Sequence, residues 1–302
     1  MATAEQGGSR HPSFHASWQT LGTPPPDALV GPRVVTQHAL LPVAEAAARL
    51  RESGASGPGE WLEWLEDHHA IASPVLAGTS GVRVALRPGE LTLLLLDADG
   101  AARKTRPLLR CTVEEAWAWV RSELAEVGAD VSVLGEGVPA APDLPPLPES
   151  LGGALGCPDR AAQEELERWL RNADHVLRAI ARASQDASAV RCPPGGRLEL
   201  RTELLHPTRQ GEEERRVEVG MSAGDATHPH PHFFVCARPA EAMPADEVLW
   251  WEPRDGGARA VLPGAEVSRH RDGEAQAATV DAFFERAIPL AHRAVHREWR
   301  RR

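Results

Sequence analysis

The chain has 302 residues, of which 43 are acidic and 33 basic, so its formal net charge is −10. This length allows one large domain or two ordinary ones, each with a sizeable core. A negative surface repels phosphate backbones and anionic lipids, so we expect neither a nucleic acid nor a membrane as a partner. The first residues lack the apolar core of a signal peptide, and no apolar stretch is long enough for a bilayer, which predicts a cytoplasmic protein.

The first half of the chain is expected to combine helices with a β-meander, over residues 31–138. Residues 1–30 are rich in Gly, Pro, Ser and Ala, a composition that predicts a flexible N-terminal arm. A helix is predicted over 34–53, with Pro42 in its first turn, where the missing N–H costs nothing. Short apolar runs separated by Gly, Pro or Asp-Gly between 68 and 109 predict the meander.

A second helix and a linker are expected to close this half. Thr112 and Glu115 have the spacing of a capping box, which predicts a helix that ends at Gly128. Residues 129–134 predict a short strand. The proline-rich stretch 139–157 is expected to be a linker to the second half.

Residues 158–302 are expected to contain a long helix, an antiparallel sheet and a C-terminal helix. Apolar residues recur at spacings of three and four over 159–184 and 274–299, which predicts the two helices. Five runs with strand-like patterns between 197 and 262 predict the sheet. We therefore predict an α+β fold, with antiparallel meander sheets flanked by a few long helices.

A Gly-x-Ser-x-Gly motif runs from Gly220 to Gly224, after a predicted strand. This is the pattern of the nucleophile elbow of α/β-hydrolases, with Ser222 as the nucleophile. The elbow needs a helix directly after the serine, whereas two prolines and an extended run follow here, which favours a strand-ending turn. Ser222 and Asp225 are the candidate catalytic residues of a hydrolase alternative.

Three histidines alternate with prolines at His228, His230 and His232. Alternate residues of an extended segment lie about 6.6 Å apart on one face, so two of them can bind one ion, whereas the first and third are about 13 Å apart. Zinc needs a further ligand, and Asp225 is near in sequence. These histidines are the candidate metal ligands. Our main expectation includes no cofactor, and zinc is the alternative.

Three segments of the second half carry a family resemblance. Residues 191–198 are Arg-Cys-Pro-Pro-Gly-Gly-Arg-Leu, residues 220–225 are Gly-Met-Ser-Ala-Gly-Asp, and residues 231–235 are Pro-His-Phe-Phe-Val. They resemble a family of uncharacterised bacterial proteins, a domain of unknown function, with the patterns Arg-Cys-Trp-Pro-His-His-Phe-Asp, Gly-x-Ser-Pro-Gly-Asp and Pro-Tyr-Phe-Tyr-Val. The resemblance extends over about residues 31–295.

The chain departs from that family at the first segment. Gly195, Gly196 and Leu198 stand where the family has His-His and Asp, the groups that a metal or acid–base site would use. Compared with that family, this chain is therefore expected to be a divergent member with a binding or accessory role.

The expected function is that of a non-catalytic accessory protein that binds a small molecule or a protein. The missing polar motif supports this reading, and so do the paired tryptophans, which suit a pocket or an interface as well as a core. The alternative is a metal-dependent or serine hydrolase-type enzyme that uses the segment from Ser222 to His232.

Overall fold

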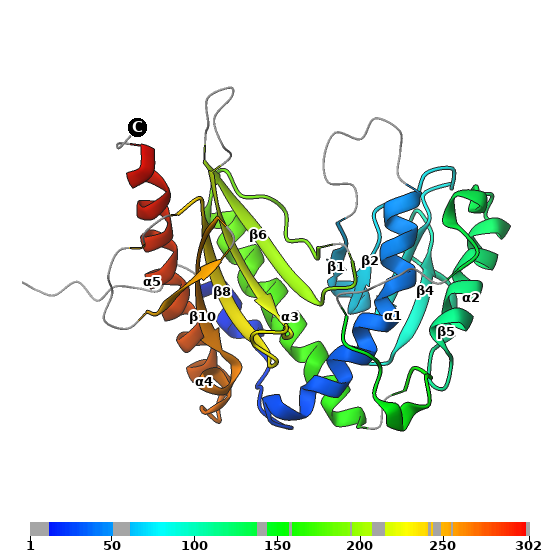
Figure 1. Ribbon diagram of the computed structural model, residues 1–302, viewed down its shortest axis with the longest axis horizontal. Coiled ribbons are helices and arrows are strands. Elements are labelled where there is room, and N and C mark those ends of the chain that lie inside the picture. The colour runs from blue at the N-terminus through cyan, green and yellow to red at the C-terminus, as the bar shows by residue number, and fades with distance from the viewer. Residues whose placement is uncertain are drawn as a thin grey trace, which may run out of the picture.

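The fold contains two five-stranded antiparallel sheets and five α-helices (Figure 1). The computed structural model describes residues 12–50, 61–137, 144–156, 159–193, 195–206, 215–240, 243, 249–254 and 256–299. The first sheet has the order β1 (Glu63–Leu65), β2 (Ala70–Ala72), β3 (Arg83–Arg87), β4 (Thr92–Leu96), β5 (Ala102–Pro107). The second has the order β6 (Glu199–His206), β7 (Arg215–Ser222), β8 (His232–Arg238), β10 (Gly257–Pro263), β9 (Trp251–Arg254). The helices are α1 (Val30–Arg49), α2 (Val113–Glu126), α3 (Arg160–Ala183), α4 (Gly264–Ser268) and α5 (Gly273–Trp299).

This architecture confirms the predicted α+β class. The first sheet packs against α1, which α2 flanks, and the second sheet packs against α3 and α5. Helices α1 and α3 contact each other where they converge at the bottom of Figure 1, and they join the two layers. No helix in the described part of the chain is both long enough and apolar enough to cross a membrane.

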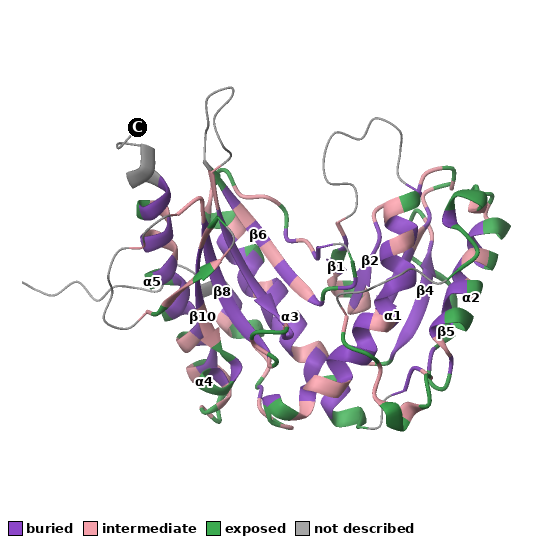
Figure 2. Cartoon of the chain, in the orientation of Figure 1, coloured by how far each residue is buried: buried purple, intermediate pink, exposed green. Residues whose placement is uncertain are grey.

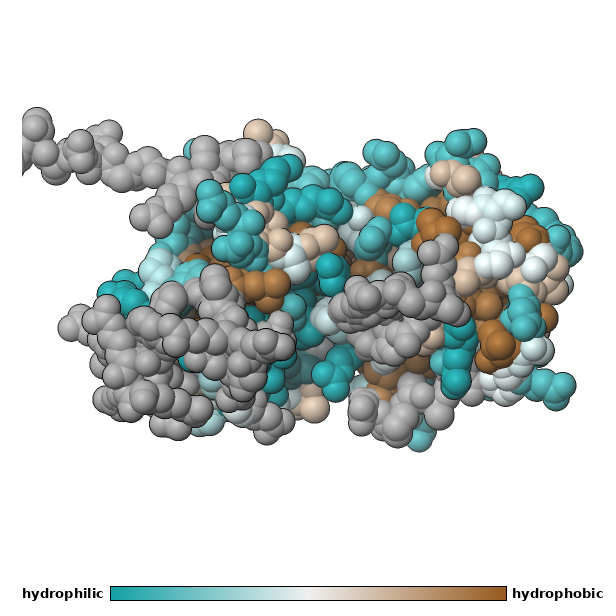
Figure 3. Space-filling model, turned by 90° about the horizontal axis from the view of Figure 1, so that it is seen from above, coloured by the Kyte–Doolittle hydropathy of each residue, from teal (hydrophilic) through white to brown (hydrophobic). Residues whose placement is uncertain are grey.

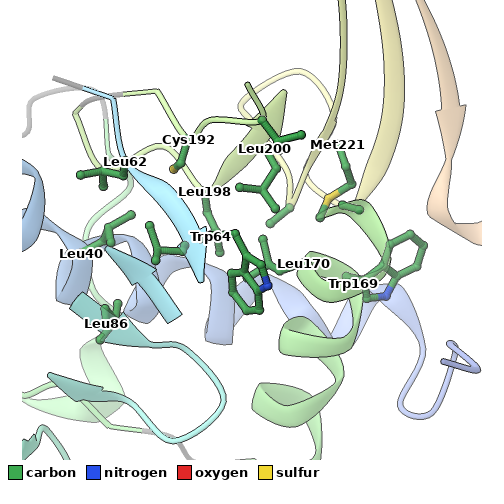
Figure 4. Close-up of a cluster of buried hydrophobic side chains, with 14 of the residues drawn as sticks. Leu40, Leu62, Trp64, Leu86, Trp169, Leu170, Cys192, Leu198, Leu200 and Met221 are labelled. Carbon is green, nitrogen blue, oxygen red and sulfur yellow. The ribbon is translucent and has the colours of Figure 1, made fainter. Parts of the chain in front are cut away.

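One hydrophobic core extends through both halves of the chain (Figure 4). Leu40 of α1 and Leu86 of β3 lie at one end of this cluster, and Met221 of β7 lies at the other. Trp64 of β1 and Leu200 of β6 lie between them, and each of these five side chains is at most 1% exposed. The two halves therefore have separate sheets but a common interior.

Helix α1 begins earlier than the sequence predicts. It starts at Val30, so Pro32 takes the first-turn position that was expected for Pro42, and Pro42 lies in the middle of the helix. A proline there removes one helical hydrogen bond and crowds the preceding turn. The helix is buried on most of its surface, as Figure 2 shows, and this burial offsets the local cost.

Of the two predictions around α2, the capping box is correct and the strand that follows the helix is not. The capping box is confirmed, because the Thr112 hydroxyl accepts from the Glu115 N–H at 3.2 Å and the Glu115 carboxylate accepts from the Thr112 N–H at 2.8 Å. The strand expected over 129–134 is wrong, because Val131–Leu134 form a 3₁₀ helix. The Asp130 side chain accepts from the Ser132 N–H at 3.1 Å, and this local bond favours a turn over a strand.

Much of the region expected to be a flexible N-terminal arm packs on the second half. It forms the 3₁₀ helices η1 (Pro12–Ser17) and η2 (Pro26–Leu29). Phe14 and Leu21 are buried, and the backbone of Gln19 exchanges two hydrogen bonds, of 2.9 and 2.7 Å, with the side-chain amide of Asn172. Such anchors are invisible in composition alone. The first eleven residues of the predicted arm lie outside the described residues.

Part of the predicted proline-rich linker also packs on the core. It contains the 3₁₀ helix η5 (Glu149–Leu151). Leu155 is fully buried, and its N–H donates to the Cys111 carbonyl at 2.6 Å. Residues 139–143 and 157 of this stretch lie outside the described residues.

Candidate functional site

A cavity of about 510 Å³ lies between α1 and one face of the second sheet. Its walls come from α1, from strands β6, β7, β8, β9 and β10, from the segment that joins β7 to β8, and from Leu144 and Pro145. This volume is within the range of small-molecule sites. The charged residues of its lining are Arg33, Arg197, Glu199, Arg201, Glu218, Asp225, Arg238, Arg254 and Arg259.

The second sheet presents different chemistry on its two faces. On one face, Phe233 packs against Trp169 of α3 and Phe284 of α5, with ring centroids 6.0 and 5.8 Å apart. The next residue, Phe234, lines the cavity, as does Cys236 two positions further on. Since successive strand residues point to opposite faces, the helices cover the apolar face and the cavity lies on the polar one. The same alternation is visible along β6 in Figure 2.

The charge of the cavity is opposite to that of the chain. Six arginines and three carboxylates line it, so its formal charge is +3, whereas the whole chain carries −10. Figure 3 shows many hydrophilic residues on the face of the molecule seen from above. Positive side chains gathered in a concave, partly dehydrated site concentrate anions there.

Arg33 is the most unusual residue of the lining. It is only 4% exposed, and within the described chain its guanidinium forms no ion pair. One terminal nitrogen donates to the Gly224 carbonyl at 2.9 Å, and its buried Nε has no acceptor among the described residues. Burial lowers the pKa of Arg33, and the charge of Asp225 only partly opposes this. A buried cation without a paired anion is costly and is typical of a functional site.

Arg259 connects three other residues of the site. It is 5% exposed, and its terminal nitrogens lie 3.1 Å from the Asp225 carboxylate and 2.6 Å from His232 Nε2. Its guanidinium also lies 4.4 Å from the centre of the Phe234 ring, a cation–π contact. Its Nε, like that of Arg201, is buried without an acceptor in the described chain.

Asp225 is the internal counter-ion of this cluster. One carboxylate oxygen accepts from the backbone N–H groups of Thr227 and His228 at 2.8 and 2.7 Å, and the other accepts from Arg254 at 3.3 Å and from Arg259. Burial raises the pKa of Asp225, but these hydrogen bonds lower it by more, so that the pKa is about 2. The carboxylate is therefore ionised at neutral pH.

His232 is neutral in this environment. Burial lowers its pKa, the hydrogen bond to the His230 carbonyl opposes this, and the nearby Arg259 lowers it again, to about 4. The 2.9 Å contact assigns the proton to Nδ1, which donates to the carbonyl, so that Nε2 accepts from Arg259. Both ring nitrogens are thus engaged.

Packing around the cavity accounts for both glycines of the Gly-x-Ser-x-Gly motif. A Cβ on Gly220 would lie 2.5 Å from Cζ of Phe234 and 2.7 Å from the Leu200 carbonyl oxygen. The absence of a side chain lets the Phe234 ring lie across β7. Gly224 has φ of +129°, and a Cβ there would lie 2.4 Å from the Pro229 carbonyl oxygen.

Ser222 lies in this motif without the partners of a catalytic serine. It is 3% exposed, and its hydroxyl accepts from the Gly224 N–H at 3.1 Å. The residue opposite it on β8 is His232, whose nitrogens bond to His230 and Arg259 instead. The described chain continues after Ser222 as bends and extended backbone. It therefore supplies neither the general base nor the helix that an elbow serine uses.

Two of the three candidate metal ligands lie together, and the third lies apart. Asp225, His228 and His232 each offer a ligand atom, and these atoms are within 4.8 Å of one another. His230 instead has its Nδ1 3.5 Å from a carboxylate oxygen of Asp27. The histidine spacing alone does not indicate which pair converges, because the segment bends.

The donor set of this trio fits a cation poorly. The lone pair of His232 Nε2 already accepts from Arg259, and a divalent ion at this nitrogen would face the guanidinium charge at close range. Both oxygens of Asp225 accept hydrogen bonds as well. A metal could bind only if Arg259 moved away.

The segment in which the chain departs from the resembling family borders the cavity. Leu198 belongs to the lining, and a Cβ on Gly196 would lie 3.1 Å from Leu41 of α1 and 3.2 Å from the Gln37 carbonyl oxygen. Gly196 has φ of +74°, which favours glycine. Glycine at position 196 therefore lets this segment lie close against α1.

The decisive arginines were not among the candidates from sequence. Arg33 lies in a mainly apolar helix, and Arg201 and Arg259 lie in strands next to buried residues. Each could be identified as belonging to the polar face of its element, but their convergence depends on how α1 docks against the second sheet. Only Asp225, Ser222 and the histidine segment pointed to this region.

Comparisons with protein-family models, with curated proteins and with solved structures find no match to this chain. The resemblance to a family of uncharacterised bacterial proteins therefore stays a prediction, and the function has to be inferred from the cavity itself.

Proposed function

We propose that this protein binds an anionic small molecule, without chemical conversion, in the cavity between α1 and the second sheet. The observation that carries the proposal is the reversal of charge, in which a lining of formal charge +3 belongs to a chain of charge −10. Arginine is permanently charged and presents several donors, which suits the recognition of carboxylates and phosphates.

The state of Arg33 supports the same function. Burying its charge without a carboxylate partner destabilises the ligand-free protein. An anion in the cavity supplies the missing charge close to this guanidinium and to that of Arg259. The free energy of binding would thus come from charged groups that lack a compensating charge in the ligand-free protein.

The test is a thermal-shift screen of anionic metabolites followed by calorimetry at constant ionic strength. We expect at least one anion to raise Tm by about 4 °C or more when present at about 100 times its Kd. Arg33→Met should weaken that binding at least tenfold. Arg49→Met is the matched control, because Arg49 belongs to the same helix but is exposed and paired with Glu45. Equal binding by both variants, or no response to any anion, would reject the proposal.

A metal-dependent or serine hydrolase remains the second candidate, and one observation favours its metal version. The ligand atoms of Asp225, His228 and His232 are close enough to share one ion. Metal analysis of the purified protein, compared with a His228→Ala variant, distinguishes the two functions. Stoichiometric zinc that is lost in the variant would favour the enzyme. Labelling of Ser222 by a fluorophosphonate probe would favour its serine version.

A further inference from the structure

Resting on the proposed anion-binding function, we propose that the anionic group of the ligand is a tetrahedral phosphate, as in a small phosphomonoester. Single donors from several arginines, on different elements, would hold it. The arginines of the lining come from several walls of the cavity, and a phosphate has three terminal acceptor oxygens that can face them. The charge of the cavity and the present partners of its arginines both point to the phosphate.

The charge of the cavity matches a dianion. Its lining has three more arginines than carboxylates. A phosphomonoester carries a charge of about −1.5 to −2 at pH 7, whereas one carboxylate carries −1. The phosphate therefore neutralises more of the surplus. The surplus is spread over α1, β6, β8, β9 and β10, so the positive charges surround the cavity instead of lying at one wall.

The arginines already use the ends of their guanidinium groups. In Arg259 one terminal nitrogen donates to Asp225 and the other to His232. In Arg201 one terminal nitrogen lies 3.5 Å from Glu199, and the guanidinium covers the Trp61 ring at 4.5 Å. In each guanidinium group Nε is buried and has no hydrogen-bond acceptor among the described residues.

Arg33, on the opposite wall of the cavity, has a similar pattern of hydrogen bonds. One of its terminal nitrogens donates to a backbone carbonyl, and its Nε lacks an acceptor. Arg33, Arg201 and Arg259 line the cavity from three different elements, α1, β6 and β10, which suits an anion with acceptor oxygens on several sides. A tetrahedral phosphate presents acceptors in several directions, whereas the acceptors of a carboxylate lie in one plane.

Asp225 provides a test of whether the arginines of the cavity bind the anion. Its ionised carboxylate accepts from Arg254 and Arg259, so it competes with an incoming anion for the same guanidinium groups. Replacing it with asparagine removes one negative charge and keeps an oxygen for the backbone N–H groups of Thr227 and His228. Asp225→Asn should therefore bind phosphate more tightly than the original protein.

The experiment is isothermal calorimetry of the full chain with inorganic phosphate, glycerol 3-phosphate and succinate, at pH 7.5 and constant ionic strength. We expect both phosphates to bind at least tenfold more tightly than succinate. Arg259→Lys should weaken phosphate binding at least tenfold, and Asp225→Asn should strengthen it about threefold or more. Arg269→Lys, at the exposed residue that follows α4, should leave it unchanged.

Each outcome separates this inference from the proposed function. Succinate binding as tightly as the phosphates, with loss in the Arg33→Met variant, would overturn the phosphate assignment and keep the anion site. No binding of any of the three anions, together with no response in the wider screen, would overturn both. Should Arg259→Lys fail to fold, the comparison of the two phosphates with succinate on the unaltered protein still decides the assignment, because equal or tighter binding of succinate would overturn it.

Discussion

At the scale of single residues, Arg33 shows how a side chain can oppose the stability of its own protein. It is almost fully buried in a helix that is otherwise mainly apolar, and the described chain gives it a carbonyl acceptor but no ion pair. Folding therefore removes a guanidinium from water with little compensation. Residues that lower stability in this way are common at binding sites, because selection acts on the function of the protein.

Arg33→Met should stabilise the ligand-free protein. Methionine fills a similar volume and needs no hydrogen bonds, so removal of the buried charge should raise the free energy of unfolding by about 1–2 kcal/mol, after loss of the bond to Gly224. Urea unfolding at pH 7.5 measures the change, with Arg49→Met as the control. A loss of more than about 1 kcal/mol would show that Arg33 holds the fold together instead.

His232 should make the protein sensitive to acid below pH 6.5. Its pKa is about 4 in the folded state and 6.5 in the unfolded state, so the unfolded chain takes up the proton first. Stability is therefore complete above pH 6.5 and falls as the pH drops toward 4, by about 3 kcal/mol at most. Below that range, the ionised Asp225, with a pKa of about 2, adds a further loss between pH 4 and 2.

Urea unfolding at pH 7.5 and pH 5 tests this prediction. In His232→Gln, an amide oxygen can still accept from Arg259, and the difference between the two pH values should shrink by at least half. His270→Gln, at a partly exposed position next to α4, should keep the original difference. An unchanged difference in His232→Gln would assign the acid sensitivity to other groups.

At the scale of elements, strand β7 combines two requirements in eight residues. Val217, Val219 and Met221 are fully buried on the face that packs against the helices, whereas Glu218, Gly220 and Ser222 belong to the face of the cavity. Gly220 is needed because the aromatic ring of β8 lies across it. The resulting Gly-x-Ser-x-Gly pattern resembles a catalytic motif, but sheet packing accounts for its glycines.

Gly220→Ala should destabilise the second sheet by about 1–3 kcal/mol, because the new methyl group overlaps the Phe234 ring and the Leu200 carbonyl. The displaced ring would also disturb the cation–π contact of Arg259, so anion binding should weaken as well. Gly137→Ala is the control, since nothing lies within 4 Å of its added Cβ. Thermal unfolding in both variants decides the matter, and equal Tm values would contradict this explanation of the motif.

The sequence was informative where local patterns decide the structure. Apolar periodicity located α3 and α5, the capping box at Thr112 was confirmed, and short strand-like runs located most strands of both sheets, although β1 lies before the predicted meander. It failed where distant contacts decide, as for the segment that Asn172 anchors and for the mid-helix Pro42. The cavity belongs to the second kind, because its arginines are distant in sequence and come together only through tertiary packing.

At the scale of the whole molecule, the cavity lies where the two halves meet. Arg33 and Gln37 come from α1, which packs on the first sheet, and the remaining charged walls come from the second half. Both halves contribute side chains to the common core (Figure 4). A ligand that bridges them therefore links regions far apart in the chain.

Hydrogen exchange should detect this link. With a saturating anion, amides of α1 and of strands β8 and β10 should exchange more slowly, because the ligand adds contacts to both walls. Strands β3 and β4, in the other sheet, serve as the internal reference and should change little. Protection confined to the second sheet would show that α1 takes no part in binding.

The different chemistry of the two faces of the second sheet affects which substitutions this protein tolerates. Along β7 and β8, neighbouring positions are subject to different constraints, since one set maintains the interior and the other lines the cavity. A saturation mutagenesis map should therefore alternate with a period of two, with losses of abundance at Val217, Val219 and Met221. Variants at Glu218, which lies between Val217 and Val219, should keep their cellular abundance and differ in the ligands that they bind. New ligand preferences could thus arise on this strand without loss of the fold.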